Sequence, residues 1–286
     1  MSDRNRAEGW KYAKLSGHSN EEKVAKLTKN DKKTQKRILD CAHIFNAEIT
    51  DVKYGGLTET NVPCIFNGET TKSKTDMWIY LSNNKTIKIT IKKDTGGQVY
   101  LIAIDRFIKG YEIQYNETIP NDVKKAINLY FGSDNEHNIP TIIQKYSIKN
   151  EKLIDLQIRK HRLVADTLKK YDEKLFNALI EWFDISSKNL FDFCFSKGLA
   201  ANENDYADIV WYINLVGDLE LDTMINLKDI IKTMPKNTHY GVANGGSTIQ
   251  LPFGFVQWHS PTKVIPGCLQ FHHNYDKIIN FCKQTY

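Results

Sequence analysis

The sequence has few cysteines and no closely spaced pair of them. An odd number of widely separated cysteines argues against a disulfide framework and a zinc ribbon, and it favours a reducing compartment. The chain also lacks an apolar run of membrane-spanning length, and its amino terminus lacks the apolar core of a signal peptide. We therefore expect a cytoplasmic protein with no membrane segment. The cysteines are Cys41, Cys64, Cys194, Cys268 and Cys282.

Charge of one sign is not in large excess either. The 286 residues carry a formal net charge of +5, which permits a polyanionic partner without requiring one. The basic excess is local, because residues 1–37 contain eleven Lys or Arg against five acidic residues. The length allows one large domain or two small ones with a substantial core.

Two short segments with the period of a half-buried strand lie on either side of Asn83-Asn84. In each arm, aliphatic residues alternate with polar or aromatic ones, which predicts a hairpin with one face toward the core. The residues on the other face are Asp76, Trp78 and Tyr80 in the first arm, and Lys88, Thr90 and Lys92 in the second.

The length of the connecting loop decides which residues meet across this hairpin. A two-residue loop at Asn83-Asn84 would direct Asp76 and Lys92 to opposite faces. A three-residue loop over 83–85 would place Asp76 opposite Lys92. We predict the three-residue loop, because it brings the ionic groups together while both aliphatic rows face the core.

An acid on one strand and a lysine on the next is an arrangement with which metal-dependent nucleases hold a divalent ion beside a phosphate. Phosphodiester hydrolysis needs charge neutralisation and a water of lowered pKa, and an ion held by carboxylates supplies both. The Asp76 carboxylate and the Ile91 carbonyl are the expected ligands. Lys92 would orient the water or stabilise the transition state. A surface hairpin with a chance Asp and Lys is the alternative.

The pattern Asp76…Thr90-Ile91-Lys92 resembles that of the PD-(D/E)xK nuclease superfamily and, within it, the type II restriction endonucleases. The resemblance covers roughly residues 10–110. Asp76 matches the first acid and Lys92 the lysine, whereas Thr90 stands where the second acid is usual. Some members with such a replacement recruit a glutamate from the preceding helix, and Glu21 is the candidate here. Gln98 resembles the polar residue that follows the lysine in some lineages.

Two simpler interpretations of these added residues stay open. Glu21 would be a solvated first-turn glutamate of a helix that starts at Asn20, where Ser19 and Glu22 form a capping-box pattern. Gln98 would be a helix-start residue that contacts backbone.

The resemblance also has implications beyond single residues. It implies an α/β (α+β) fold with a mixed β-sheet core flanked by helices. It further implies Mg²⁺ as the cofactor, double-stranded DNA as the substrate, a homodimer, and functional pairing with a cognate DNA methyltransferase.

Residues 241–274 hold a second concentration of polar side chains, interleaved with glycines. Gln, Asn, Ser, Thr and His can contact base edges, and glycine allows close backbone approach. Similar segments occur near the carboxyl termini of restriction endonucleases, so this segment is the expected DNA-recognition element. The candidate DNA-binding residues are Gln98, Asn244, Ser247, Thr248, Gln250, Gln257, His259, Gln270, His272, His273 and Asn274. A core hairpin with satisfied histidines is one alternative. An HNH-type metal site is another, which the histidine spacing disfavours.

The pattern along the chain predicts a nuclease core over residues 1–135, a mainly helical region over 136–235 and a β-rich carboxyl part over 236–286. Helices are expected at 20–27, 32–45, 98–109, 121–131, 151–183, 186–197, 204–217, 223–233 and 275–284. Extended segments are expected at 47–54, 63–66, 240–258 and 268–272, in addition to the hairpin.

The leading hypothesis is therefore a Mg²⁺-dependent type II restriction endonuclease. An inactive, nuclease-like DNA-binding or regulatory module is an alternative that Thr90 supports. A nuclease acting on RNA or branched DNA is the third.

Overall fold

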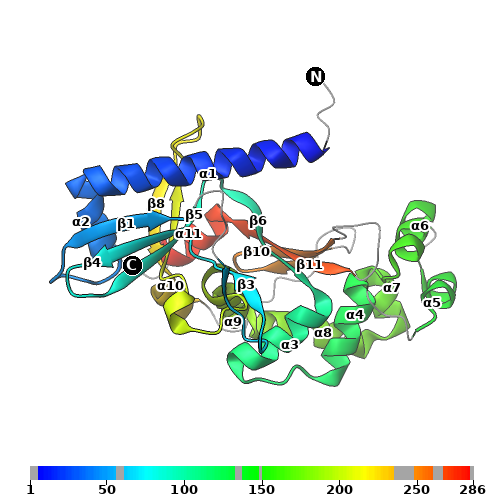
Figure 1. Ribbon diagram of the computed structural model, residues 1–286. Coiled ribbons are helices and arrows are strands. Elements are labelled where there is room, and N and C mark those ends of the chain that lie inside the picture. The colour runs from blue at the N-terminus through cyan, green and yellow to red at the C-terminus, as the bar shows by residue number, and fades with distance from the viewer. Residues whose placement is uncertain are drawn as a thin grey trace. The chain divides into compact units, whose positions relative to one another are not determined.

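The computed structural model of the chain describes residues 6–55, 61–132, 137–147, 150–234, 248–259 and 267–283. Contacts divide these residues into two compact units (Figure 1). The first unit combines the chain up to Thr95 with residues 195–233, and the second combines residues 96–194 with the chain from Met234 onward. Each unit thus draws on two stretches of chain, whereas the ranges expected from sequence are contiguous.

The first unit is built on a five-stranded mixed sheet. Its central pair, β5 and β7, is parallel, and all the other neighbours are antiparallel. A separate two-stranded ribbon pairs β2 with β3. In sheet order the strands are β1 (Ile49–Tyr54), β4 (Met77–Leu81), β5 (Thr86–Lys92), β7 (Ile209–Ile213) and β8 (Asp222–Asn226). The ribbon strands are β2 (Asn61–Pro63) and β3 (Thr70–Lys72).

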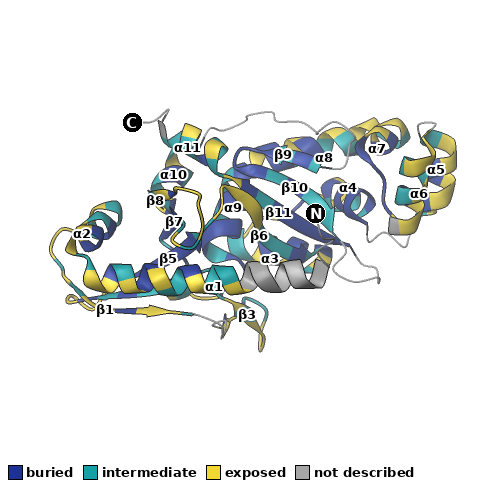
Figure 2. Cartoon of the chain, turned by 90° about the horizontal axis from the view of Figure 1, so that it is seen from above, coloured by how far each residue is buried: buried dark blue, intermediate teal, exposed yellow. Residues whose placement is uncertain are grey.

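Helices α1 (Arg6–Asn30) and α2 (Lys32–Cys41) pack against this sheet. Val24 and Ile38 belong to the same buried cluster as the aliphatic rows of β4 and β5. Along α1 from Leu15 onward, buried and exposed residues recur so that one side of the helix is covered (Figure 2). The Asp31 side chain accepts a hydrogen bond from the Thr34 amide at 2.8 Å and caps α2, a contact that stabilises a helix by about 1 kcal/mol.

The hairpin of β4 and β5 has the expected faces but not the expected register. Trp78 pairs with Lys88, so that Asp76 lies at the level of Thr90 rather than Lys92. The loop has three residues, Ser82 to Asn84, one position earlier than predicted. Asn84 adopts a left-handed conformation (φ 62°), which Asn tolerates better than most residues, and this closes the loop before Lys85. An odd loop keeps Asp76, Thr90 and Lys92 on one face.

Several expected helices of this unit are wrong in part. α1 begins before the predicted start at Asn20, and Phe45 lies beyond the end of α2, with 76% of its surface exposed. Residues 209–213, expected to be helical, form the fully buried strand β7. A continuous apolar run suits a buried strand as well as a helix, and pairing with β5 decides the outcome. Residues 222–226 form β8, and only 227–233 form a helix, α10 (Leu227–Thr233).

The second unit is built on a four-stranded antiparallel sheet. The expected helix at 98–109 is wrong for its first half: residues 96–103 form a strand, and the helix starts at Ile104. The strand is stabilised by pairing with a segment more than 160 residues later in the chain. In sheet order the strands are β6 (Gly96–Ala103), β11 (Cys268–Asn274), β10 (Gly254–His259) and β9 (Thr248–Leu251).

Helices make up the rest of this unit, in agreement with the expected helical character of the middle of the chain. α4 begins at Asn121 directly after Pro120, as predicted. A π-helical turn at Phe193–Lys197 follows α9, and the chain passes from the second unit to the first within it. The helices are α3 (Ile104–Tyr115), α4 (Asn121–Phe131), α5 (Ile139–Tyr146), α6 (Glu151–Lys160), α7 (Ala165–Tyr171), α8 (Glu173–Ile185), α9 (Ser187–Asp192) and α11 (Tyr275–Lys283).

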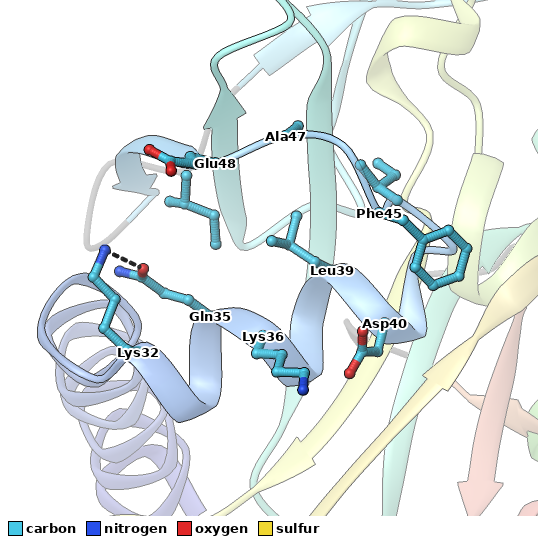
Figure 3. A pocket seen from close by; sticks show the side chains of 10 residues that line it. Lys32, Gln35, Lys36, Leu39, Asp40, Phe45, Ala47 and Glu48 are labelled. Atoms are coloured by element: carbon cyan, nitrogen blue, oxygen red, sulfur yellow. Dashed lines mark hydrogen bonds between the residues drawn. The ribbon is translucent and has the colours of Figure 1, made fainter.

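The expected fold class, a mixed sheet with flanking helices, a helical middle region and a β-rich carboxyl part, is confirmed. In the described part of the chain, no helix is both long enough and apolar enough to cross a membrane. A recess in the first unit lies between α2 and the segment that leads to β1, with Leu39 and Ala47 on its walls (Figure 3). None of the residues proposed from the sequence for catalysis or DNA binding lines it.

Candidate active site

Asp76 lies immediately before β4, and its backbone is fixed on both sides. Its amide donates to the Ile89 carbonyl at 2.9 Å, and its carbonyl accepts from the Gly55 amide at 3.0 Å. These bonds hold the start of β4 between its two neighbouring chain segments. The side chain, 29% exposed, therefore projects from a fixed point on the sheet.

Only one oxygen of the Asp76 carboxylate accepts hydrogen bonds from the described residues. Oδ2 accepts from the Ile91 amide at 2.7 Å and from the Thr90 hydroxyl at 3.1 Å. Oδ1 accepts no hydrogen bond from any residue that the structure describes. A carboxylate anchored through one oxygen and open at the other has the form of a prepared cation ligand, since ligating carboxylates are usually hydrogen-bonded themselves.

Thr90 and Lys92 complete a hydrogen-bonded group around Asp76. The Lys92 ammonium donates to the Thr90 hydroxyl at 2.8 Å and to the Ile91 carbonyl at 3.2 Å. Its distance to Asp76 Oδ2 is 3.9 Å. The structure thus brings together the acid, the threonine and the lysine proposed from the sequence. The Ile91 amide donates to Asp76, and the Ile91 carbonyl, expected to be a second metal ligand, accepts from Lys92.

The segment of α1 that contains Glu21 lies at the same edge of the sheet as Lys92. The Asn20 side chain donates to the Ile213 carbonyl at 2.9 Å, at the carboxyl end of β7. The Lys93 ammonium, just beyond β5, donates to the Ser16 hydroxyl at 3.2 Å. β5 and β7 are parallel neighbours whose carboxyl ends meet at this edge.

Glu21 itself contacts His18, whose Nδ1 lies 3.2 Å from Glu21 Oε2, and both side chains are 17% exposed. Glu22 is 45% exposed and pairs with Lys26 at 2.7 Å, and this ion pair lowers the pKa of Glu22. Of the two glutamates, Glu21 is therefore the more enclosed one. This supports the choice of Glu21 over Glu22.

The group as a whole is sparse in acidic ligands. Among the described residues, no cluster of three or more His, Cys, Asp and Glu side chains is arranged to hold a metal ion. Any metal here would be held by Asp76, a backbone carbonyl or Glu21, with water completing the shell. Mg²⁺ fits such a donor set, because it prefers oxygen and usually retains several waters.

A second group of candidate residues lies on one face of the sheet in the second unit. Strand pairing places Gln257 beside Gln270 and Thr248, and Phe255 beside His272 and Gln250. The opposite face carries buried aliphatic and aromatic side chains. The predicted DNA-binding residues on the polar face are Gln98, Thr248, Gln250, Gln257, His259, Gln270 and His272. We call this set the polar row.

The amides of the polar row form a chain of hydrogen bonds. Gln257 Nε2 donates to Gln270 Oε1 at 2.8 Å, and Gln270 Nε2 donates to Gln98 Oε1 at 2.7 Å. His272 stacks on Phe255, with ring centroids 4.4 Å apart. Burial, followed by the charge of His259, lowers the pKa of His272, and the neutral ring can accept at Nε2 from Gln257 at 3.3 Å. These contacts fix the direction of each amide.

Two predicted DNA-binding residues that the structure describes, His273 and Asn274, are not on the polar row. His273 is buried on the opposite face, because adjacent strand residues point in opposite directions. Asn274 accepts from the Lys277 amide at 2.9 Å at the start of α11. Asn244 and Ser247 lie outside the described residues. In the alternative HNH-type site, His259 and His272 share the polar face but His273 does not, so the three histidines do not lie on one face.

Sequence reasoning missed His18, Asn20 and Phe255. Asn20 anchors α1 through Ile213 and through the Leu215 amide, which donates to it at 2.7 Å. Its position next to Glu21 was the only available signal. The contact of His18 with Glu21 follows from their helical spacing of three residues.

Comparison with known proteins gives little beyond this geometry. No family model matches the sequence, and no curated protein matches it. A solved structure of restriction endonuclease MspI in complex with its cognate DNA is similar, with 12% sequence identity and a TM-score of 0.47. The match covers 92% of this chain and 87% of that chain.

Proposed function

We propose that this protein is a Mg²⁺-dependent endonuclease that hydrolyses double-stranded DNA at a specific short sequence, in the manner of a type II restriction endonuclease. The observation that carries the proposal is the group of Asp76, Thr90 and Lys92, in which one carboxylate oxygen is anchored and the other is open. An ammonium lies beside that carboxylate, where a phosphate and its attacking water would need positive charge.

In this proposal Asp76 and the carbonyl of Ile91 hold the metal, with Glu21 from α1 as a further ligand. The bound ion supplies charge neutralisation and a water of lowered pKa. Lys92 would orient the attacking water or stabilise the charge that develops on the phosphate. Because each chain carries one such group, cleavage of both strands suits a pair of chains related by two-fold symmetry. A cognate methyltransferase would protect the cell's own copies of the target sequence.

The experiment that tests the function is digestion of unmethylated phage DNA by the purified protein, with Mg²⁺ and with a chelator. We expect discrete fragments with Mg²⁺ and intact DNA with the chelator. Uncut but retarded DNA would contradict the proposal and favour the inactive DNA-binding module, for which the neutral Thr90 is the supporting observation. Cleavage restricted to structured or single-stranded substrates would favour a nuclease for RNA or branched DNA.

Sequence specificity is assigned to the polar row, and Gln270 is its central member. Replacing Gln270 with leucine keeps the side-chain volume but removes the two hydrogen bonds that the Gln270 amide makes, one with Gln98 and one with Gln257. We expect cleavage at the target site to fall by about 10- to 100-fold, the usual effect of losing one base-reading amide. Binding to nontarget DNA should stay the same, as measured by fluorescence anisotropy.

A matched control is Gln144→Leu, because Gln144 is an exposed glutamine on α5. It should cleave like the wild type. Equal losses of target and nontarget binding in Gln270→Leu would contradict a role in specificity.

A further inference from the structure

Thr90 is buried, with 2% of its surface exposed, yet its hydroxyl belongs to the candidate active site. A threonine hydroxyl has one proton to donate and two lone pairs to accept with. The proton goes to Asp76 Oδ2 at 3.1 Å, and one lone pair accepts from the Lys92 ammonium at 2.8 Å. Both neighbours together fix the rotation of the hydroxyl.

The Lys92 ammonium has no direct hydrogen bond to Asp76. Their separation of 3.9 Å exceeds hydrogen-bonding distance, so the short connection between ammonium and carboxylate runs through Thr90. The other contact of Lys92 is the Ile91 carbonyl at 3.2 Å. A lysine side chain is long and flexible, and these two acceptors are what restrain its charged end.

We propose that Thr90 is a positioning residue, whose hydroxyl holds the Lys92 ammonium and the Asp76 carboxylate in place without binding the metal itself. A carboxylate at this position would add a negative charge, pair with Lys92 directly and ligate the metal. Because the Thr90 hydroxyl is neutral, Asp76 supplies the negative charge in its hydrogen-bonded group with Thr90 and Lys92. The consequence for cleavage rests on the proposed function, whereas the restraint of Lys92 does not.

Positioning and ligation predict different kinetic effects. Thr90→Val keeps the shape of the side chain but removes the hydroxyl. If Thr90 positions Lys92, kcat should fall by about 100-fold, the cost of a misplaced catalytic group. The half-saturating Mg²⁺ concentration should then stay within about twofold of the wild type, because no ligand is lost and Asp76 Oδ2 keeps its shorter bond from the Ile91 amide at 2.7 Å. Thr90→Ser, which keeps the hydroxyl, should restore kcat to within about tenfold.

The experiment is a Mg²⁺ titration of cleavage rate for the wild type, Thr90→Val and Thr90→Ser, with Thr86→Val as control. Thr86 lies on the same strand and the same face as Thr90, but its side chain bonds to neither Asp76 nor Lys92. An unchanged kcat in Thr90→Val would overturn the proposal. A rise of tenfold or more in half-saturating Mg²⁺ would overturn it in favour of direct ligation, and so would failure of Thr90→Ser to recover.

A second measurement does not need cleavage. NMR relaxation of the Lys92 ε-methylene in the metal-free protein should show a restrained group in the wild type and a mobile one in Thr90→Val. Equal mobility in both would overturn the proposal. If the wild type cuts no DNA but the Lys92 ε-methylene is more mobile in Thr90→Val than in the wild type, the proposed function is wrong and the positioning role of Thr90 stands.

Discussion

Replacement of Lys92 by methionine is expected to lower the rate of DNA cleavage by about 10³-fold, within the usual range for loss of a group that assists proton transfer or stabilises charge. Methionine keeps an unbranched side chain of similar length and removes only the ammonium. The folded state should tolerate this change, because Asp76 Oδ2 keeps its bonds from the Ile91 amide and the Thr90 hydroxyl.

The measurement is single-turnover cleavage at saturating Mg²⁺, together with DNA affinity in Ca²⁺ by fluorescence anisotropy. Affinity should remain within a few-fold of the wild type, because one ammonium contributes modestly to binding a long polyanion. Lys85→Met is the matched control, since Lys85 is exposed and directly follows the loop of the same hairpin. Cleavage by Lys92→Met at a rate near that of the wild type would remove Lys92 from the active site.

The sequence alone predicted which faces of the β4–β5 hairpin are apolar, because strand periodicity depends on adjacent residues. The burial of Met77 and Ile79 confirms this. The predicted register was wrong by two residues, because Asp76 lies at the level of Thr90 and not of Lys92. The register depends on the conformation of Asn84, which lies in the left-handed region. The grouping of Asp76, Thr90 and Lys92 survived the error because a shift of two residues keeps a side chain on its face.

The larger errors concern strands whose partners are distant in the sequence. The segments Val99–Ala103 and Ile209–Ile213 are apolar enough to suit either a helix or a strand. Each becomes a strand because a partner exists: β11 for the first and β5 for the second. Periodicity cannot reveal such pairing, which tertiary contacts impose on local preference.

The polar row, in contrast, could be predicted in part from the sequence. Gln257 and His259 on one strand, and Gln270 and His272 on another, are two residues apart, so each pair necessarily shares a face of its strand. Their convergence on one sheet follows from the pairing of β10 with β11. The hydrogen-bonded order of the amides and the stacking of His272 on Phe255 depend on that register and had no signal in the sequence.

Replacement of Asp76 by asparagine is expected to weaken both metal binding and cleavage. The asparagine carbonyl can still accept from the Ile91 amide, which preserves the anchor of the hairpin, but the negative charge that attracts a divalent ion is gone. We expect the half-saturating Mg²⁺ concentration to rise by at least about 100-fold. Cleavage at a fixed, moderate Mg²⁺ concentration should then fall by about 10³-fold. Asp51→Asn, which changes an exposed carboxylate on β1 of the same sheet, is the matched control.

Measuring metal binding in the absence of DNA distinguishes residues that bind the metal from residues that act only in cleavage. Isothermal titration with Mn²⁺ should show no binding to Asp76→Asn, binding weakened by about tenfold in Glu21→Gln, and wild-type binding in Glu22→Gln. The ranking follows from the structure, because Asp76 has an open oxygen on the rigid sheet, whereas Glu21 must approach from α1 and already contacts His18. Wild-type binding by Asp76→Asn would show that the metal lies elsewhere. Equal effects in Glu21→Gln and Glu22→Gln would withdraw Glu21 as a ligand while leaving Asp76 in place.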